Sequence, residues 1–308
     1  MSLFACGKTL IIANPASRSG RGAEAAHKVA ELFGAAATTQ NYELYLTHAP
    51  HDATQRAASA IDFDTVCAVG GDGLVHEVIA GLMRISEDIR PRFALIPMGS
   101  GNDFARTLAL KKNDPHTAFD QLMHGRVRAC DLGWVNGIYF AQTLSFGLDA
   151  AIALDTSVRR AHNSAQHGAG LFATSGIKIL SHNLTGWPVH MVCDGEEIDA
   201  TDIIFAIQNG PTYGGGFKVC PDAQPDDGKL NLCYSVKRPT AAHALALFAR
   251  ARVGKHTHSP VLKLRSFTTL ELDFPEGTPP CQVDGEPLTG SHFSIRVEPH
   301  VLNVVVPQ

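Results

Sequence analysis

At 308 residues the chain is longer than one small core requires and suits two domains of ordinary size. Hydrophobic residues make up 44% and charged residues 18%, which excludes disordered and collagen-like classes. With 26 Lys and Arg against 30 Asp and Glu, the formal net charge of -4 gives no general attraction to nucleic acid or to an anionic membrane. We therefore expect no nucleic-acid partner, and any membrane contact must be local.

The cysteines and the chain start indicate a reduced, cytoplasmic setting. The seven cysteines are an odd number, are widely scattered, and never form a C-x-x-C pair. The first residues lack a basic start followed by an apolar run, and no apolar stretch of 18 residues occurs. We expect neither secretion nor a membrane span.

The first third of the chain alternates strand-like and helix-like segments. Strands are predicted at 9–13, 42–46, 65–69 and 93–97, and helices at 23–33, 51–60, 74–83 and 102–110. Repeated β-α units joined by short loops imply a mostly parallel sheet covered by helices.

From about residue 129 short strand-like pieces separated by turns dominate. Strands are predicted at 138–144, 189–193, 203–208, 230–236, 261–264, 268–272 and 292–297, with helical stretches at 151–180 and 240–253. The fold class is therefore an α/β domain with a mostly parallel sheet at 1–130, followed by a β-rich antiparallel sandwich domain at 131–308. The last residues are expected to return to the first domain.

Three loops follow predicted strands of the first domain. In the first, Asn14-Pro15-Ala16-Ser17 leads through a Gly- and Ser-rich turn into a helix. Backbone N–H groups and hydroxyls at a helix N-terminus suit phosphate or ribose oxygens. An ordinary β-α connection is the alternative.

The second loop, Gly70-Gly71-Asp72-Gly73, is more specific. Apolar residues recur at helical spacing from Leu74 onward, so these glycines lie where a strand turns into a helix N-terminus. Glycines permit close approach of a nucleotide, and the helix dipole favours its charge. Asp72 is poorly placed for a structural role and well placed to contact a metal or orient a hydroxyl. A tight turn with an incidental acid is the alternative.

The third loop, Pro97 to Arg106, repeats this pattern. Ser100 or Asn102 is predicted to cap the following helix, while Asp103 and Arg106 project toward the same sheet edge. Because ligands bind at the carboxyl ends of parallel strands, all three loops predict one site.

The ordered set of motifs resembles the diacylglycerol kinase catalytic-domain family, which also contains sphingosine kinases, ceramide kinases and bacterial lipid kinases. The resemblance covers nearly the whole chain. It is carried by the Asn14-Pro15 loop, Gly70 to Glu77, Pro97 to Arg106, Asp131-Leu132-Gly133, Ser145 to Ala150, Gly214 to Gly228, and Asp284-Gly285-Glu286.

The resemblance implies a nucleotide-binding first domain of NAD kinase/diacylglycerol kinase type and a β-rich domain for the lipid. The positions similar to the family's ATP contacts are Asn14, Pro15, Ala16, Ser17, Thr47, Gly70, Gly71, Asp72, Gly73, Leu74, His76, Glu77, Ser100, Asn102 and Asp103.

The resemblance also implies a magnesium loop and a base. The segment from Gln224 to Lys229 is similar to a loop in which one carboxylate and two main-chain carbonyls bind Mg²⁺, which maps to Asp227 with backbone oxygens of Gln224 and Lys229. Glu286 resembles the residue that accepts the proton of the lipid hydroxyl. Asp284 and Asp72 compete with Glu286 as alternative bases.

Departures from the family pattern concern the substrate. Family members often carry Thr where this chain has Leu74 and Ser100, and Leu74 with His76 resembles the sphingosine-kinase form of the turn. The first loop also has Arg18-Ser19 as two extra residues before its glycine. The lipid thus stays open between diacylglycerol and a sphingoid base.

The predicted function is transfer of the γ-phosphoryl group of ATP, with Mg²⁺, to a lipid hydroxyl. The alternatives are an NAD kinase-like small-molecule kinase and a non-catalytic nucleotide-binding regulator. The bases and apolar residues between 154 and 180 predict either peripheral membrane contact at the inner membrane surface or helix packing on the β-rich domain. Homodimerisation stays open as well.

Overall fold

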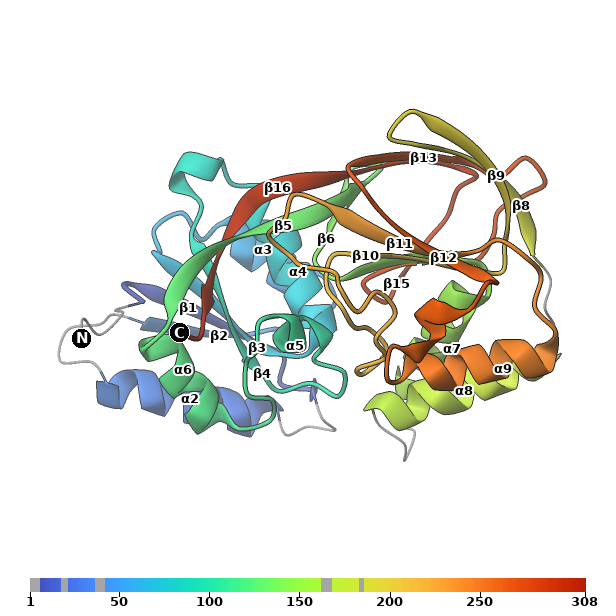
Figure 1. Cartoon of the computed structure of the whole chain (residues 1–308). Helices are drawn as coiled ribbons and strands as arrows, with labels where there is room; N and C mark the ends of the chain where they lie inside the picture. The colour runs from blue at the N-terminus through green and yellow to red at the C-terminus, as the bar shows by residue number, and fades with distance from the viewer. Residues whose placement is uncertain (1–5, 18–21, 37–41, 162–167, 183–185) are drawn as a thin grey trace. The chain divides into compact units, whose positions relative to one another are not determined.

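The computed structural model describes residues 6–17, 22–36, 42–161, 168–182 and 186–308, which form two compact units (Figure 1). Unit 1 comprises Met1–Cys130 and His300–Gln308, and unit 2 comprises Asp131–Pro299. Strands β5 (Arg126–Val135) and β16 (His292–Val306) each contribute residues to both units.

Unit 1 contains a parallel sheet. Its strands are β1 (Thr9–Ala13), β2 (Tyr42–Leu46), β3 (Thr65–Gly70), β4 (Arg92–Pro97) and the end of β16, in the order β2-β1-β3-β4-β16. All four neighbouring pairs are parallel. Every residue of β1 and β3 is buried, because helices cover both faces of such a sheet and its strands become continuous apolar runs.

The helices of unit 1 are α2 (Gly22–Ala36), α3 (Asp52–Ala58), α4 (Asp72–Leu82), α5 (Asp103–Thr107) and α6 (Pro115–Met123), with a short 3₁₀ helix η1 (Glu87–Ile89). α2 and α6 pack together on one face of the sheet, and α3 and α4 pack together on the other (Figure 1). The helix predicted at 102–110 is shorter in the structure, because Ala109 adopts a left-handed φ of 58° that no α-helix can continue through.

Unit 2 contains two antiparallel sheets. One has the order β12-β11-β10-β7-β14-β15, and the other runs β16-β13-β8-β9, with β5 and β6 paired alongside. The new strands are β6 (Ile138–Phe140), β7 (Thr143–Phe146), β8 (Trp187–Cys193), β9 (Glu196–Asp202), β10 (Ile204–Gln208), β11 (Leu230–Ser235), β12 (Leu262–Phe267), β13 (Thr269–Asp273), β14 (Cys281–Val283) and β15 (Glu286–Leu288). Phe146 and Phe205 from the first sheet share a buried core with Phe293 from the second.

Helices α7 (Gly147–Ala161), α8 (Gly168–His182) and α9 (Ala241–Ala251) cover the opposite face of the six-stranded sheet, followed by the 3₁₀ helix η2 (Lys255–His258). The alternation of strand side chains explains the two layers: Ile207 lies in the inter-sheet core, and its neighbour Ala206 lies in the core beneath the helices. The predicted α/β domain and the predicted antiparallel domain are both confirmed. Within the described segments, none of the helices has the length and apolarity needed to traverse a bilayer.

Candidate functional site

The parallel register of unit 1 brings four loops to one edge of the sheet. Ala13 is paired with both Leu46 and Val69, and Gly70 is paired with Pro97, so the strands end at the same level. Thr47 N donates to Ala13 O at 2.9 Å, and Met98 N donates to Gly70 O at 2.7 Å, which continues the pairing just past the strand ends. The loops singled out in the sequence therefore begin side by side.

Two glycines hold the second and third loops in direct backbone contact. A Cβ built on Gly99 would lie 2.3 Å from Gly71 Cα, and one built on Gly71 would lie 2.9 Å from Gly99 Cα. Neither position has room for a side chain. Gly73 differs, because nothing in the described chain lies within 4 Å of the Cβ position it would have. Of these three glycines, only Gly73 therefore leaves space for a ligand to approach the backbone.

Asn102 fixes the third loop from inside. Its Oδ1 accepts from Gly99 N at 2.8 Å and its Nδ2 donates to Gly99 O at 2.7 Å. The side chain thus pairs with both backbone polar groups of Gly99, as a neighbouring strand would. Only 2% of Asn102 is exposed, and its φ of 55° is left-handed. Because both polar atoms are committed to Gly99, the prediction that Asn102 caps the next helix is wrong.

Asp72 supplies that cap instead. Its Oδ1 accepts from Asp103 N at 2.7 Å and from Phe104 N at 3.3 Å, which are the first two amides of α5. A carboxylate at a helix N-terminus is stabilised by these amides and by the dipole. The expectation that Asp72 lacks a structural role is therefore wrong, since it ties the second loop to the third.

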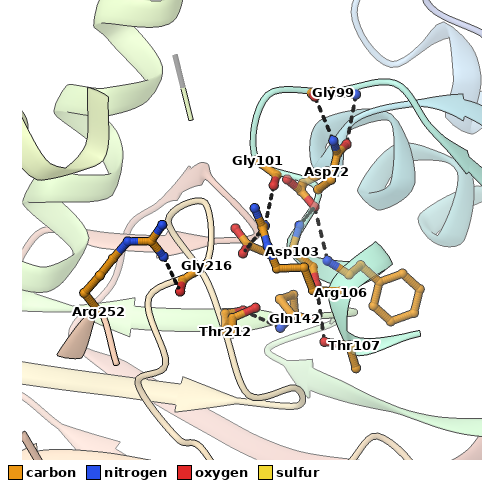
Figure 2. Close-up of polar contacts among 12 residues, drawn as sticks. Asp72, Gly99, Gly101, Asp103, Arg106, Thr107, Gln142, Thr212, Gly216 and Arg252 are labelled. Carbon is orange, nitrogen blue, oxygen red and sulfur yellow. Dashed lines mark hydrogen bonds and ion pairs between the residues drawn. The ribbon is translucent and has the colours of Figure 1, made fainter. Parts of the chain in front are cut away.

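Two carboxylates meet at Gly101 (Figure 2). The Cβ position of Gly101 lies 2.5 Å from Asp72 Oδ2 and 3.5 Å from Asp103 Oδ2. Arg106 pairs with Asp103 Oδ1 at 2.9 Å and also donates to Gly101 O. Arg106 thus ties Asp103 to the backbone of Gly101, and the Asp72 carboxylate lies at the same glycine.

The remaining predicted nucleotide positions surround this edge in different ways. Asn14 Oδ1 accepts from Ala16 N at 2.9 Å, and Ser17 N donates to Asn14 O at 3.2 Å, so Asn14-Pro15-Ala16-Ser17 forms a local turn. Leu74 is buried, and its side chain packs on Gly70, so only its backbone can face a ligand. His76, Glu77 and Ser100 are partly exposed. Arg18 and Ser19 lie outside the described residues.

In unit 2, Asp284 and Gly285 form the two-residue turn of the β14–β15 hairpin. Their φ values of 48° and 95° are those of a type I′ turn, for which Asp-Gly is a favoured sequence. The Asp284 carboxylate accepts from the backbone N–H groups of Ala141, Gln142 and Thr143 at 2.8, 3.1 and 2.9 Å. The prediction of a single strand at 138–144 is wrong. These amides donate to Asp284, and the chain divides there into β6 and β7.

Glu286 follows this fixed turn and is exposed. Gly285 is held on both sides, since its N–H donates to Gln282 Oε1 at 2.7 Å and its carbonyl accepts from Ser157 Oγ at 3.3 Å. The Glu286 side chain is therefore exposed to solvent next to a turn that hydrogen bonds hold in place. Both carboxylate oxygens of Asp284, in contrast, accept hydrogen bonds from backbone amides.

The loop from Gln224 to Lys229 is anchored by Asp131, whose role the sequence did not reveal. Asp131 Oδ2 accepts from Gly228 N at 2.7 Å, and Asp131 N donates to Pro225 O at 2.6 Å. Asp227 is exposed and accepts from Lys229 N at 3.0 Å. Loss of hydration, together with the charges of Asp131 and Asp226, raises the pKa of Asp227 against the opposing effect of Lys229.

This chemistry suits a hard cation, which prefers carboxylate and carbonyl oxygens. Among the described side chains, no group of three or more His, Cys, Asp or Glu is arranged to hold a metal ion. The family resemblance implies that an ion at this loop would be held by the Asp227 carboxylate and by main-chain carbonyls of Gln224 and Lys229.

Comparison with known proteins assigns both units. Residues 8–135 match the diacylglycerol kinase catalytic domain, and residues 142–306 match the YegS C-terminal NAD kinase beta sandwich-like domain. A protein of Yersinia enterocolitica named "Probable lipid kinase YegS-like" is 29% identical over 254 residues, which cover 81% of each chain. Its counterpart in Yersinia pestis is 28% identical over 255 residues, again covering 81% of each.

Solved structures share the fold. A Bacillus anthracis protein described as a candidate diacylglycerol kinase superposes with a TM-score of 0.80 at 22% identity, covering 97% of this chain and 96% of its own. An NAD kinase from Archaeoglobus fulgidus, solved with ATP, gives a TM-score of 0.56 at 12% identity, covering 98% and 93%. With both halves matched by family models, this chain belongs to the diacylglycerol kinase catalytic-domain family with a YegS-type C-terminal domain.

Proposed function

We propose that the chain is an ATP- and Mg²⁺-dependent lipid kinase. A hydroxyl oxygen of the lipid attacks the γ-phosphorus, the new O–P bond forms, the bond to the β–γ bridging oxygen breaks, and ADP leaves. The observation that carries the proposal is the convergence of Asp72 and Asp103 on Gly101, beside the open backbone of Gly73 at the start of α4.

The nucleotide is assigned to the strand-end edge of unit 1. The N-terminus of α4 favours negative charge, and phosphates bind there when glycine lets them approach. Gly73 is exposed and has that space. The NAD kinase of the same fold was solved with ATP, which supports this nucleotide.

Two places in the chain suit Mg²⁺. Asp72 and Asp103 would hold an ion at the phosphates, where it offsets the charge of the triphosphate when bound. Asp227, with the carbonyls of Gln224 and Lys229, would hold a second ion that stiffens its loop. The remaining tasks of the chain are to position the phosphates and the lipid hydroxyl in line.

Glu286 is the base in this proposal. Asp72 and Asp284 both accept hydrogen bonds from backbone amides, which fixes them as structural anions. Glu286 is exposed on a turn held at both ends, so its carboxylate is available to take the hydroxyl proton. General base catalysis contributes roughly 10²–10⁴-fold in rate.

We also propose a cytoplasmic protein that visits the membrane through α7 and α8. Val158 on α7 and Ile177 on α8 are 58% and 55% exposed, and Arg160 on α7 is exposed as well. Arg159, in contrast, donates to Thr174 Oγ1 and Ser175 Oγ and so packs the two helices together. Membrane contact is thus assigned to the apolar pair and to Arg160.

The lipid is identified by an acceptor panel. Purified protein is incubated with γ-labelled ATP and Mg²⁺, and with diacylglycerol, sphingosine, ceramide or NAD, and the labelled product is separated. Label on one of the lipids is expected. Label on NAD alone would establish the small-molecule kinase, and ATP binding without any labelled product would establish a non-catalytic regulator.

A further inference from the structure

Two residues clamp the corner of residues 141–143, which lies between β6 and β7. The three N–H groups of the corner donate to the carboxylate of Asp284. Its three carbonyls accept from Asp284 N at 2.8 Å, from Asn209 N at 3.0 Å and from Asn209 Nδ2 at 3.0 Å. Each of the six backbone polar groups of the corner is thus bonded to Asp284 or to Asn209. Because Asp284 lies in the turn that precedes Glu286, the placement of this turn depends on Asn209 as well.

Asn209 directly follows β10 and is fully buried. Its Nδ2 donates to Asp131 O at 2.8 Å as well as to Ala141 O at 3.0 Å. Both acceptors are carbonyls, so a flipped amide would place Oδ1 against two oxygens that can only accept. The orientation of the side chain is therefore fixed, and its two N–H groups join β5 to the corner.

The other end of the amide contributes no bond to the described chain. Asn209 Oδ1 is buried without a partner among the described residues. A leucine of similar size would remove this acceptor, but it would leave the carbonyls of Asp131 and Ala141 without these donors, and buried carbonyls are normally paired. The position therefore depends on the two donors of the asparagine side chain.

Asn209 also connects two parts of the candidate site in unit 2. Asp131, whose carbonyl accepts from Asn209, holds the loop at 224–229 through Gly228 N. Ala141, whose carbonyl accepts from the same amide, donates its N–H to Asp284 Oδ2 at 2.8 Å. Hydrogen bonds therefore run from this loop, through Asn209, to the turn next to Glu286.

We propose that Asn209 is a positioning residue for Glu286. It does not take part in proton transfer itself. It fixes the 141–143 corner, the corner fixes the Asp284 turn, and the turn fixes the carboxylate that takes the proton of the lipid hydroxyl. A displacement of about 1 Å at a reacting group can cost about a hundredfold in rate, so such a clamp has a measurable effect. The catalytic part of this role rests on the proposed kinase function, whereas the clamp itself does not.

Amide hydrogen exchange tests the clamp without ATP, lipid or turnover. In Asn209→Ala, the N–H groups of residues 141–143 and of Gly285 should exchange at least about tenfold faster relative to the amides of β11. Ile207→Val removes one methyl group from the core on the same strand and is the control for lost stability. It should accelerate exchange at the corner and in β11 alike. Asn209→Ser keeps a single donor and should give a smaller increase, which covers the case in which the alanine variant does not fold. Unchanged relative exchange at the corner in the folded variant would overturn the proposal.

Kinetics then test the catalytic part. Asn209→Ala, or Asn209→Ser in its place, should lower kcat for the lipid at least about tenfold and leave KM for ATP within about twofold, because the nucleotide is assigned to unit 1. Ile207→Val should change neither. Adding the Asn209 substitution to Glu286→Gln should slow the enzyme little further, since the carboxylate to be positioned is already gone. A wild-type kcat in the Asn209 variant, or fully additive losses, would overturn the positioning role. A wild-type protein that phosphorylates no lipid would refute the kinase function alone and leave the exchange result to decide the clamp.

Discussion

The contact between Gly71 and Gly99 makes Gly99→Ala a sensitive probe of the site. The added Cβ would lie 2.3 Å from Gly71 Cα and 2.7 Å from Asn102 Oδ1, so the two loops must separate. Overpacking of this kind typically costs about 1–3 kcal/mol. For a domain of this size, each kcal/mol lowers the melting temperature by about 2–4 °C. We therefore expect the melting temperature of unit 1 to fall by roughly 2–12 °C.

Gly73→Ala is the matched control, since it is the same substitution in the neighbouring loop. Its methyl group meets nothing within 4 Å in the described chain, and alanine favours the helix that begins there. The melting temperature should be unchanged or slightly raised. The affinity for ATP should fall at least several-fold, because the methyl group occupies the space assigned to the nucleotide.

Scanning calorimetry and ATP titration on both variants test the reasoning. An unchanged melting temperature for Gly99→Ala would show that the loops are not in tight contact. Wild-type ATP affinity in Gly73→Ala would show that the open backbone is not where the nucleotide lies.

Three further predictions concern unit 2. Asp284→Ala leaves three backbone N–H groups without an acceptor and should lower the free energy of unfolding in urea by about 2–5 kcal/mol. Asp222→Ala, at an exposed acid, should leave it almost unchanged. Equal losses in the two variants would contradict the anchoring role of Asp284. The pKa of Asp149 is raised from 3.8 to about 6, so its protonated form stabilises the fold, and this contribution is present below pH ~4 and lost as pH rises through 6. Relative to Asp149→Asn, the wild type should lose about 3 kcal/mol between pH ~4 and ~7, and parallel stability curves would disprove the burial effect. Val158→Asn with Ile177→Asn should weaken binding to anionic vesicles, as measured by sedimentation, and undiminished binding would move membrane contact elsewhere.

The strands of unit 1 were predictable because their signal is local. Thr9–Ala13 matches the predicted range, since a continuous apolar run bounded by polar turns determines a buried parallel strand. Tyr42–Leu46 also matches its predicted range, although it is an edge strand whose residues are exposed or half-buried. The convergence of loops at one edge then follows from parallel pairing alone. Residue types at strand ends thus predicted where polar side chains gather.

What the sequence could not show depends on contacts between distant segments. Asp72 caps α5, 31 residues away, and Asp284 binds amides 141 to 143 residues away. Motif spacing carries no information about which backbone amides an acid will contact. Such acids are therefore assigned catalytic or ligand-binding roles when the sequence alone is considered. The burial of His256, whose Nδ1 has no partner among the described residues, is likewise a product of packing, since a buried histidine and a surface histidine look the same in sequence.

The central claim is that unit 1 holds ATP while Glu286 takes the proton of the lipid hydroxyl. Glu286→Gln should keep the wild-type dissociation constant for ATP and lose at least about a hundredfold in kcat for lipid phosphorylation, with Glu276→Gln, another exposed acid of unit 2, as the control that leaves both unchanged. An unaltered kcat in Glu286→Gln would contradict the account.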